Sequence, residues 1–517
     1  MKFLMLCYFE SFAKNPNMKK KSNQLHYSSI TIMLPLGILM GVISFSFLHL
    51  LNYIFHLVAI VLTLFFCTFN AFIFRKYGRL LFAFVAGFLI SVIHYQSVIL
   101  SEQFLEGLYK KNIEVELRVA SDISHKNKSW RFSASSIIID STPLDCTFYV
   151  SLPDSYPKPQ RGDKLLLQGQ LLDGFGEYAG YLARPSLIEL SKPDPPEISL
   201  KLRDYFSSRF EELIGPGFNN EVALGLGYLT GQKDTMSEDF TEKLRRAGLA
   251  HVVVASGFHL GVVTGLAKKL FKKVSRFASY SSAFLAIIIF VSITGFSASM
   301  IRAGLVIGMS LFASYFGRKF HPARLLLYTA SISLLYKPQL ILNTAWQLSF
   351  ASFAGLLFFA PLITDYFFGE DIGTIPQSLI QTISAQLFCL PISIYTFGAF
   401  SPIGLISNLI IPPTIPLAML LCVSSVAMSF VPELGILLAY PTRLLLSFHV
   451  GVINYLSHFD WANISLKSGD VRVFWIYLIL ICICLFFKWR SKHSFRPRYA
   501  KLSTMEKSQK DVKIYSC

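Results

Sequence analysis

The stretch GLAHVVVASGFHLGVV, residues 248–263, combines groups that can do chemistry with the hydrophobicity of a membrane segment. His251, Ser256 and His259 are polar, and burying such groups without partners costs free energy. Ser256 and His259 are three residues apart, so in a continuous helix they would share one face. The stretch therefore predicts that these side chains have either partners or a function at membrane depth.

Three interpretations of this stretch stay open from the residues alone. Small and hydroxyl-bearing residues such as Ser256 and Gly257 let membrane helices pack closely and hydrogen bond to one another. A serine beside a histidine base could also be the nucleophile of an intramembrane hydrolase, although no third member or nucleophile turn accompanies this pair. The third interpretation is that the polar side chains line a polar path across the membrane.

A second polar element follows in GFSASMIRAG, residues 295–304. Ser297 and its small neighbours permit close packing, and Arg302 lies between two apolar runs. An arginine inside a membrane helix costs about 2.5–3.5 kcal/mol on insertion scales, so it should face protein or water. Arg302 could extend to the membrane interface from the end of a span. Its guanidinium could also contact phosphate, whose geometry it matches.

Polar side chains also occur in two later apolar segments. Gln347 and Ser349 lie at the start of one of them. Asn408 lies just before Pro412 and Pro413, which predict a broken helix. Broken helices at membrane depth persist only where protein or water satisfies the freed backbone groups. Each of these residues alone is more often a structural hydrogen-bonding group, but together they suit a conduit.

The elements that must position these groups are membrane spans. The chain has 517 residues, of which 53% are hydrophobic and only 15% are charged, whereas soluble domains are about one quarter charged. Apolar runs that approach the roughly 20 residues needed to cross a bilayer predict a polytopic α-helical membrane protein of about twelve spans. The spans are expected near residues 30–48, 51–74, 79–99, 249–266, 279–296, 300–316, 323–337, 344–362, 376–397, 402–430, 434–457 and 471–488.

The net charge of +17 has two readings. Lys and Arg collect in the cytoplasmic loops of membrane proteins, and a basic surface also attracts polyanions such as nucleic acids or lipid head groups. The basic tails, residues 1–29 and 488–517, predict that both termini lie in the cytoplasm. With three spans before residue 100, the polar segment that follows is expected outside the cytoplasm.

Residues 100–198 differ from the rest of the chain, because charges and prolines appear and apolar residues alternate with polar ones. The stretches SWRFSASSIIID, TFYVSLP and KLLLQGQLL alternate in the manner of β-strands, and the turn signal Arg161-Gly162-Asp163 precedes the last of them. Several short strands predict a small OB-like β-barrel. An amphipathic helix is expected next, in SLKLRDYFSSRFEELI, and then a short helix capped by Ser237.

Several kinds of site are not indicated by the sequence. None of the eight cysteines has metal-ligand spacing with nearby histidines. The sequence also contains no Gly-Lys-Ser/Thr loop that would bind nucleotide phosphates. We therefore expect no metal, no other cofactor and no catalytic residues, and a transport protein rather than an enzyme.

Taken in order, these motifs resemble the ComEC competence family, the inner-membrane DNA channels of natural transformation. The family's core, Gly-x-x-His-x-x-x-x-Ser-Gly-x-His, is present as Gly248, His251, Ser256, Gly257 and His259. The further matching positions are YLTGQKDTMSEDF, Ser297 with Arg302-Ala303, Gly317-Arg318, Gln347-Leu348-Ser349-Phe350, Asn408-Leu409, Gly162-Asp163 and GEYAGYLA. Many members also carry a His-x-His-x-Asp-His motif in a metallo-β-lactamase-like domain, and this sequence contains no such motif.

The resemblance implies a channel that imports single-stranded DNA, with residues 30–99 as N-terminal spans and 199–487 as the channel domain. Polar residues would line or brace the path, and Arg302 would meet phosphates. The implied path residues are His251, Ser256, Gly257, His259, Ser297, Arg302, Gln347, Ser349 and Asn408. The implied partners are single-stranded DNA, membrane lipids, an extracytoplasmic DNA receptor, and cytoplasmic single-strand-binding or motor proteins.

An OB-like barrel could hold single-stranded DNA through basic and aromatic side chains. The candidates are Lys126, Lys128, Trp130, Arg131 and Phe132. The same residues could equally form a solvated strand face with one buried aromatic. Two other functions also stay open, namely an intramembrane hydrolase that uses Ser256 and His259 and a membrane scaffold without transport.

Overall fold

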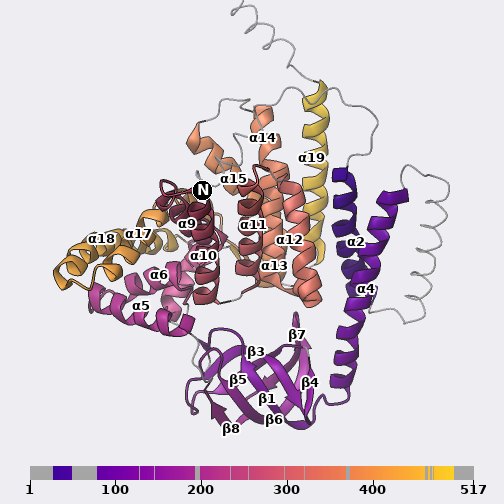
Figure 1. Ribbon diagram of the computed structural model, residues 1–517, viewed down its shortest axis with the longest axis horizontal. Helices are drawn as coiled ribbons and strands as arrows, with labels where there is room; N and C mark the ends of the chain where they lie inside the picture. Colours follow the sequence, from indigo (N-terminus) through magenta and orange to yellow (C-terminus); the bar gives the residue numbers. More distant parts are fainter. Residues whose placement is uncertain are drawn as a thin grey trace, which may run out of the picture. The chain divides into compact units, whose positions relative to one another are not determined.

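The computed structural model describes residues 27–493, with gaps at 49–77, 127, 145, 193–197, 233–234, 254, 296, 319–320, 368–372, 460–463, 466–468 and 470 (Figure 1). The predicted second span, near residues 51–74, and most of both basic tails lie outside the described residues. The described residues form two compact units. One unit lies before residue 351 and includes 401–464, and the other consists of 351–400 and the residues after 464.

Two N-terminal helices, α2 (Tyr27–Leu48) and α4 (Gly78–Glu106), pack with their backbones in contact. A Cβ atom at Gly37 would lie only 1.9 Å from the carbonyl oxygen of Phe84. Glycine at such a crossing lets membrane helices approach closely. The first and third predicted spans therefore form a close-packed pair.

The small barrel predicted between residues 100 and 198 is confirmed. Its strands are β1 (Asn112–Val119), β2 (Ser124–His125), β3 (Ser129–Ile139), β4 (Thr142–Leu144), β5 (Phe148–Pro153), β6 (Lys164–Phe175), β7 (Tyr178–Ala183) and β8 (Ser186–Ser191). The path β1-β3-β5-β7-β6 returns to β1 and closes a barrel, while β2 and β4 pair with β3, and β8 pairs with β6. Strands β5 and β7 run parallel, and the other neighbours on the path run antiparallel. This path agrees with the five-stranded Greek-key barrel of an OB-fold.

The barrel core follows from the alternation of side chains along each strand. Phe132, Phe148 and Val150 point inward and are fully buried. Their neighbours Arg131 and Tyr149 point outward and are half-buried. Strands β3, β5 and β7 therefore present one continuous outer face.

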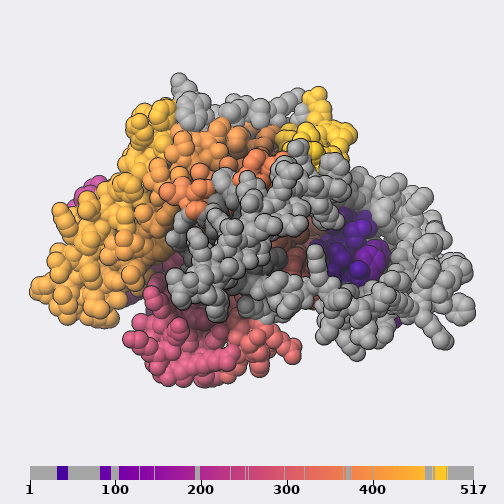
Figure 2. All heavy atoms as spheres, turned by 90° about the horizontal axis from the view of Figure 1, so that it is seen from above, coloured from indigo at the N-terminus to yellow at the C-terminus, as the bar shows by residue number. Residues whose placement is uncertain are grey.

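The helices of the first unit that follow the barrel surround an apolar core. They are α5 (Ile198–Ile214), α6 (Asn219–Leu229), α7 (Glu238–Arg246), α8 (Ala250–Val253), α9 (Gly257–Leu270), α10 (Arg276–Thr294), α11 (Ala298–Tyr315), α12 (Pro322–Tyr336), η1 (Pro338–Leu342), α13 (Thr344–Ala354), α16 (Gly404–Ile410), α17 (Ile415–Ala427) and α18 (Pro432–Ser457). Phe210, Tyr228, Leu260 and Ile453 are buried in the cluster that joins α5, α6, α9 and α18. Helices α17 and α18 pack side by side, and their orange to yellow spheres lie together in Figure 2.

The second unit is built on helices on either side of α16 to α18 in the sequence. Its elements are the π-helical segment Gly355–Phe359, α14 (Ala360–Phe367), α15 (Thr374–Phe397), β9 (Ala399–Phe400), η4 (Val471–Phe474) and α19 (Trp475–His493), and the short strand β10 (Ile464–Ser465) lies at its boundary. The Tyr477 hydroxyl donates a hydrogen bond to the carbonyl oxygen of Phe388 at 2.7 Å. This bond attaches α19 to α15.

The chain is a membrane protein, although the described residues hold fewer long spans than predicted. Four helices are long and apolar enough to cross a membrane: Arg276–Thr294, Thr344–Thr364, Ile375–Phe397 and Pro432–Ser457. Helices α16 and α17 make a fifth candidate that is bent by 53°, which confirms the predicted break within 402–430. Shorter apolar helices coincide with four more predicted spans: Ile32–Ser44, Phe82–His94, Ser299–Tyr315 and Arg472–Cys484. The total of about twelve spans stays a prediction.

The short helix α7, predicted before the first polar stretch, is confirmed. The hydroxyl oxygen of Ser237 accepts a hydrogen bond from the Phe240 backbone N–H at 3.2 Å and so caps its N-terminus. On its exposed side, the Arg245 guanidinium donates two hydrogen bonds to Glu242, at 2.8 and 2.7 Å, and these lower the pKa of the Glu242 carboxyl. The amphipathic helix expected before α7 is present as α5, with Phe210 buried and Leu202 exposed.

Candidate functional site

The stretch 248–263 is interrupted, so the expectation of one continuous span over 249–266 is wrong. Helix α8 ends at Val253, and α9 begins at Gly257. Ser256 is the N-cap residue of α9, with extended backbone (φ −135°, ψ 175°). Ser256 and His259 therefore do not share a helix face. Instead they meet at the first turn of α9, where the free backbone N–H groups of a helix need partners.

His259 supplies such a partner. Its Nδ1 accepts a hydrogen bond from the Ser256 backbone N–H at 3.2 Å and lies 3.0 Å from the Ser256 hydroxyl oxygen. Because Nδ1 accepts, the hydrogen-bond network assigns the ring proton to Nε2. The side chain is fully buried, and Nε2 has no hydrogen-bond partner among the described residues. The ring stacks on Tyr228 with 5.6 Å between centroids.

Tyr228 starts a buried chain of hydrogen bonds that sequence reasoning missed. Its hydroxyl lies 3.1 Å from Nδ1 of His449, and Nε2 of His449 lies 2.7 Å from the hydroxyl oxygen of Thr414. The Thr414 hydroxyl donates to the carbonyl oxygen of Ile411 at 2.7 Å. Thr414 must therefore accept from His449 Nε2–H, and His449 Nδ1 must accept from Tyr228.

These hydrogen bonds hold the broken span in place. Ile411 and Thr414 lie between α16 and α17, where the helix bends by 53° and backbone groups lose their regular partners. His449 comes from the middle of α18 and is fully buried. A histidine inside the apolar run 434–457 and a threonine among prolines were the sequence signals for this contact.

We expect Tyr228→Phe to destabilise the protein by about 1–3 kcal/mol, because it leaves a buried ring nitrogen of His449 without a donor. The measurement is the thermal unfolding midpoint of the detergent-solubilised protein. Tyr440→Phe is the matched control, since Tyr440 is 70% exposed. Equal midpoints for the two variants would contradict the proposed bracing of the break.

The second polar element packs directly against the first. A Cβ atom at Gly257 would lie 3.0 Å from the Cβ of Ala303, so α9 and α11 touch beside Arg302. The Nε atom of Arg302 is buried and has no hydrogen-bond partner among the described residues. The guanidinium lies over the ring of Phe350, 5.5 Å from its centroid. Helix α11 thus contacts the first turn of α9 through Ala303 and α13 through Arg302.

The remaining predicted path residues lie on the same or neighbouring elements. Ser297 is exposed and caps α11 by accepting from the Met300 N–H. The Gln347 side chain donates to the carbonyl oxygen of Ile341 at 2.7 Å, and Ser349 is half-buried on α13. His251 lies on α8, where its side chain is outside the described part of the structure.

Gly248 joins the first polar stretch to the broken span. It has a φ of +70°, and a Cβ there would lie 2.7 Å from the Cα of Gly404 at the start of α16. The hydroxyl of Ser407 donates to the carbonyl oxygen of Ala247 at 2.7 Å and fixes the same crossing. Asn408 is the next residue on α16 and is half-buried. The fold therefore brings together motifs that are more than 100 residues apart in the sequence.

Comparison with known proteins identifies the family. A family model described as "Competence protein" matches residues 228–491, which is more than half of the chain. The chain belongs to the competence protein family. ComE operon protein 3 of Bacillus subtilis (strain 168) is 25% identical to this competence protein over 216 residues, or 41% of this chain. The match spans only 27% of that relative's length, and the comparison with solved structures found no match.

The matched region of this competence protein includes the polar residues described above, namely Tyr228, Ser256, His259, Arg302, Thr414 and His449. Tyr228 is the first matched residue, and His449 lies before the end of the match. The barrel, residues 112–191, precedes it. Within the described residues, no group of three or more His, Cys, Asp or Glu side chains could hold a metal ion.

The barrel candidates of the competence protein divide into exposed and buried residues. Lys126 and Lys128 are exposed in the loop before β3. Trp130 is half-buried, and its indole N–H donates to the carbonyl oxygen of Tyr156 at 3.2 Å. Phe132 is 1% exposed and belongs to the barrel core, so a base cannot reach it in this conformation. The interpretation of one buried aromatic therefore holds for Phe132.

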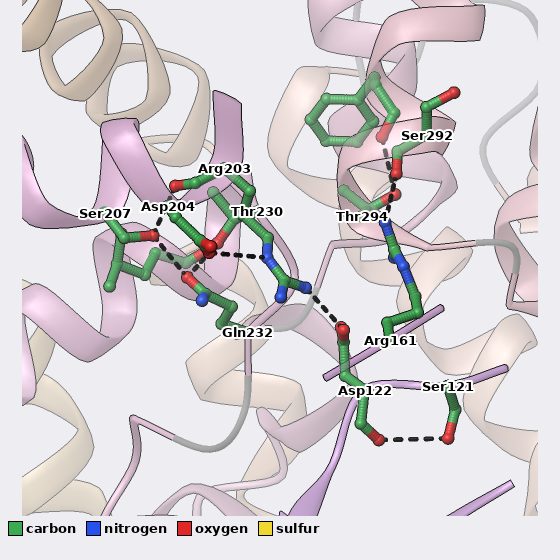
Figure 3. Close-up of polar contacts among 12 residues, drawn as sticks. Ser121, Asp122, Arg161, Arg203, Asp204, Ser207, Thr230, Gln232, Ser292 and Thr294 are labelled. Atoms are coloured by element: carbon green, nitrogen blue, oxygen red, sulfur yellow. Dashed lines mark hydrogen bonds and ion pairs between the residues drawn. The ribbon is translucent and has the colours of Figure 1, made fainter. Parts of the chain in front are cut away.

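Polar contacts attach the barrel to the helices of the first unit (Figure 3). The turn between β5 and β6 carries Arg161, which is 6% exposed and donates to the carbonyl oxygen of Ser292 at 2.7 Å. This carbonyl belongs to the last turn of α10, where a cation is favourable. A Cβ at Gly295 would lie 2.7 Å from Nη1 of Arg161, which explains the glycine there. The predicted Arg161-Gly162-Asp163 turn thus positions a helix-capping cation.

A second contact between the barrel and the helices is an ion pair. Arg203 of α5 lies 2.6 Å from Asp122 in the loop before β2, and the two side chains are 12% and 31% exposed. Nearby, the Ser207 hydroxyl donates to the Gln232 side-chain oxygen at 2.8 Å, which ties α5 to the turn after α6. These bonds link β-barrel, α5 and α6 through short polar side chains.

We expect the pair Arg203–Asp122 to show a coupling of about 1 kcal/mol, because a largely buried charged hydrogen bond contributes more than an exposed one. The measurement is a double-mutant cycle on unfolding midpoints with Arg203→Ala and Asp122→Ala. Arg209 and Glu212 on the same helix form the matched control, since both are about half exposed or more. The interpretation fails if the two pairs show the same coupling.

Proposed function

We propose that this competence protein carries single-stranded DNA across the cytoplasmic membrane. The observation that carries the proposal is the contact of Gly257 with Ala303, which sets the first turn of α9, with its Ser256–His259 pair, against the helix that carries Arg302. Two buried polar atoms, Nε2 of His259 and Nε of Arg302, have no partner among the described residues. Buried polar groups without partners are costly, so polar or anionic groups that reach these two atoms would satisfy them. Phosphate fits the guanidinium in both charge and geometry.

The same geometry is less suited to hydrolysis. A serine nucleophile needs a base whose ring nitrogen is free to take the hydroxyl proton. Here the Nδ1 atom of His259 already accepts the Ser256 backbone N–H. The distance of 3.0 Å from the Ser256 hydroxyl to Nδ1 keeps a hydrolase as the alternative that an experiment must test.

The topology and partners belong to the same proposal. We place both termini in the cytoplasm and the barrel outside it, on the distribution of basic residues. The partners would be an extracytoplasmic DNA receptor and cytoplasmic single-strand-binding or motor proteins. The description of the family model that matches residues 228–491, "Competence protein", supports a role in competence.

The test is uptake of labelled DNA into the cytoplasm by cells with the wild-type protein, a deletion, or Ser256→Ala. For a channel, we expect no uptake in the deletion and only partial loss in Ser256→Ala, since the backbone N–H that binds His259 remains. A loss in Ser256→Ala as complete as in the deletion, with normal protein level, would favour a hydrolase. Normal uptake in the deletion would contradict transport by this protein and would favour the interpretation as a membrane scaffold.

A further inference from the structure

Four aromatic side chains form a cluster on the outside of the barrel. Tyr149 lies on β5, Phe175 ends β6, and Tyr178 and Tyr181 lie on β7. The Tyr149 ring centroid is 5.3 Å from that of Phe175, 5.2 Å from that of Tyr178 and 5.9 Å from that of Tyr181. Phe175 is 51% exposed, and the three tyrosines are half-buried. We name these four residues the aromatic platform.

The strand register explains why the rings face outward. Tyr149 pairs with Tyr181 across the parallel strands β5 and β7, and Phe175 pairs with Tyr178 across the β6–β7 hairpin. The alternate residues Phe148 and Leu182 point into the core and are fully buried. The four rings therefore do not belong to the barrel core, because other side chains already fill the core positions.

The platform lies beside the start of α13. At the tip of the β6–β7 hairpin, Glu177 accepts a hydrogen bond from the Asn343 side chain at 2.6 Å. Lys337, which precedes η1, donates to the Thr147 hydroxyl next to β5 at 3.0 Å. Both contacts join the hairpin to the segment that leads to Gln347. Figure 1 shows the β7 end of the barrel below the helices α12 and α13.

We propose that the aromatic platform stacks the bases of a single-stranded nucleic acid at the entrance of the membrane segment. This inference rests on the proposed function and adds a binding site made of residues other than the barrel candidates predicted from the sequence. Each exposed or half-exposed ring offers a face or an edge to a base, and base–aromatic stacking requires no particular sequence. An OB-fold barrel binds oligonucleotides on this part of its surface, namely its central strands and the loop between its last two strands.

Stacking must supply most of the binding here, because the barrel is not basic. Residues 100–198 carry 11 Lys and Arg against 14 Asp and Glu. Arg131 lies on the same outer face as Tyr149, and Lys337 contacts Thr147 beside β5, so some cations are still within reach of a bound strand. We therefore expect a shallow dependence of binding on salt, unlike the steep dependence of proteins that neutralise many phosphates.

The experiment measures fluorescence anisotropy of labelled oligo(dT) with the full chain in lipid nanodiscs. The variants are Phe175→Leu and Tyr181→Leu, which keep an apolar side chain but remove the ring. Tyr205→Leu is the matched control, because Tyr205 is a 48% exposed tyrosine on α5 and not part of the barrel strands. Losing one stacked base should weaken binding by roughly fivefold or more. An abasic oligonucleotide should bind the wild type and the variants equally.

A rival occupant of the platform is the lipid head-group region, since aromatic side chains also gather at membrane interfaces. The variant Phe175→Trp separates the two. Quenching of its added fluorescence by oligo(dT) supports the platform, and quenching by brominated lipid instead overturns it. Unchanged oligo(dT) binding in Phe175→Leu and Tyr181→Leu also overturns it, even where DNA uptake in cells depends on the protein. If the proposed function itself were wrong, the result would be different: the deletion strain would take up DNA normally.

Discussion

Arg302→Glu should reduce uptake of labelled DNA into the cytoplasm by roughly 100-fold, while the protein stays at its normal level in the membrane. The Nε atom of Arg302 is buried and unpaired among the described residues. An anionic side chain at this place would repel the phosphates that the guanidinium is proposed to meet. Removing one partner from a buried charge contact costs about 2–5 kcal/mol, and about 2.7 kcal/mol corresponds to 100-fold.

Two further variants make this result specific. Arg302→Lys keeps the charge but loses the planar fork of the guanidinium, so we expect an intermediate uptake. Arg209→Glu reverses the charge of an exposed arginine on α5 and should leave uptake unchanged. If cells with Arg302→Glu take up DNA normally, Arg302 is a structural residue that packs over Phe350, and the proposed DNA path does not pass it.

Gly248→Ala should have the largest effect on stability among the variants considered. A residue with a Cβ atom in the left-handed region costs about 1–2 kcal/mol, and Gly248 has a φ of +70°. The new methyl group would also lie 2.7 Å from the Cα of Gly404, a backbone atom that cannot move aside cheaply. Overpacking of this kind adds about 1–3 kcal/mol. We expect a much lower unfolding midpoint, or loss of the protein from the membrane.

Gly265→Ala is the matched control for this variant. Gly265 lies within α9, and a Cβ atom there would meet nothing within 4 Å. Alanine favours a helix over glycine by about 1 kcal/mol, so this variant should be as stable as the wild type or more stable. A similar loss in both variants would mean that the crossing of Gly248 and Gly404 is not what makes Gly248 necessary.

The periodicity of the sequence was enough to predict the classes of structure. Long apolar runs located the helices that can cross a membrane, and alternation located the strands of the barrel. Prolines located the bend between α16 and α17. These signals are local, since each depends on residues within one helix or within one strand.

The candidate site was only partly predictable because its contacts are not local. The spacing of Ser256 and His259 was read as a shared helix face, but the helix begins between them, at Gly257. Tyr228 and His449 are 221 residues apart in the sequence, so no pattern within a short stretch of sequence could predict their contact. Likewise, alternation placed Trp130, Arg131 and Phe132 on one strand without stating which of them points inward.

The bond between Thr414 and His449 has a consequence for how the protein is made. The bend that Thr414 occupies obtains this partner only from α18, 35 residues later in the chain. While the ribosome is still synthesising the intervening residues, the Thr414 hydroxyl oxygen lacks its donor from His449, and lipid cannot replace that donor. Helices α16, α17 and α18 should therefore leave the insertion machinery together rather than one at a time, and a nascent chain that stops before α18 should be a substrate for membrane proteases.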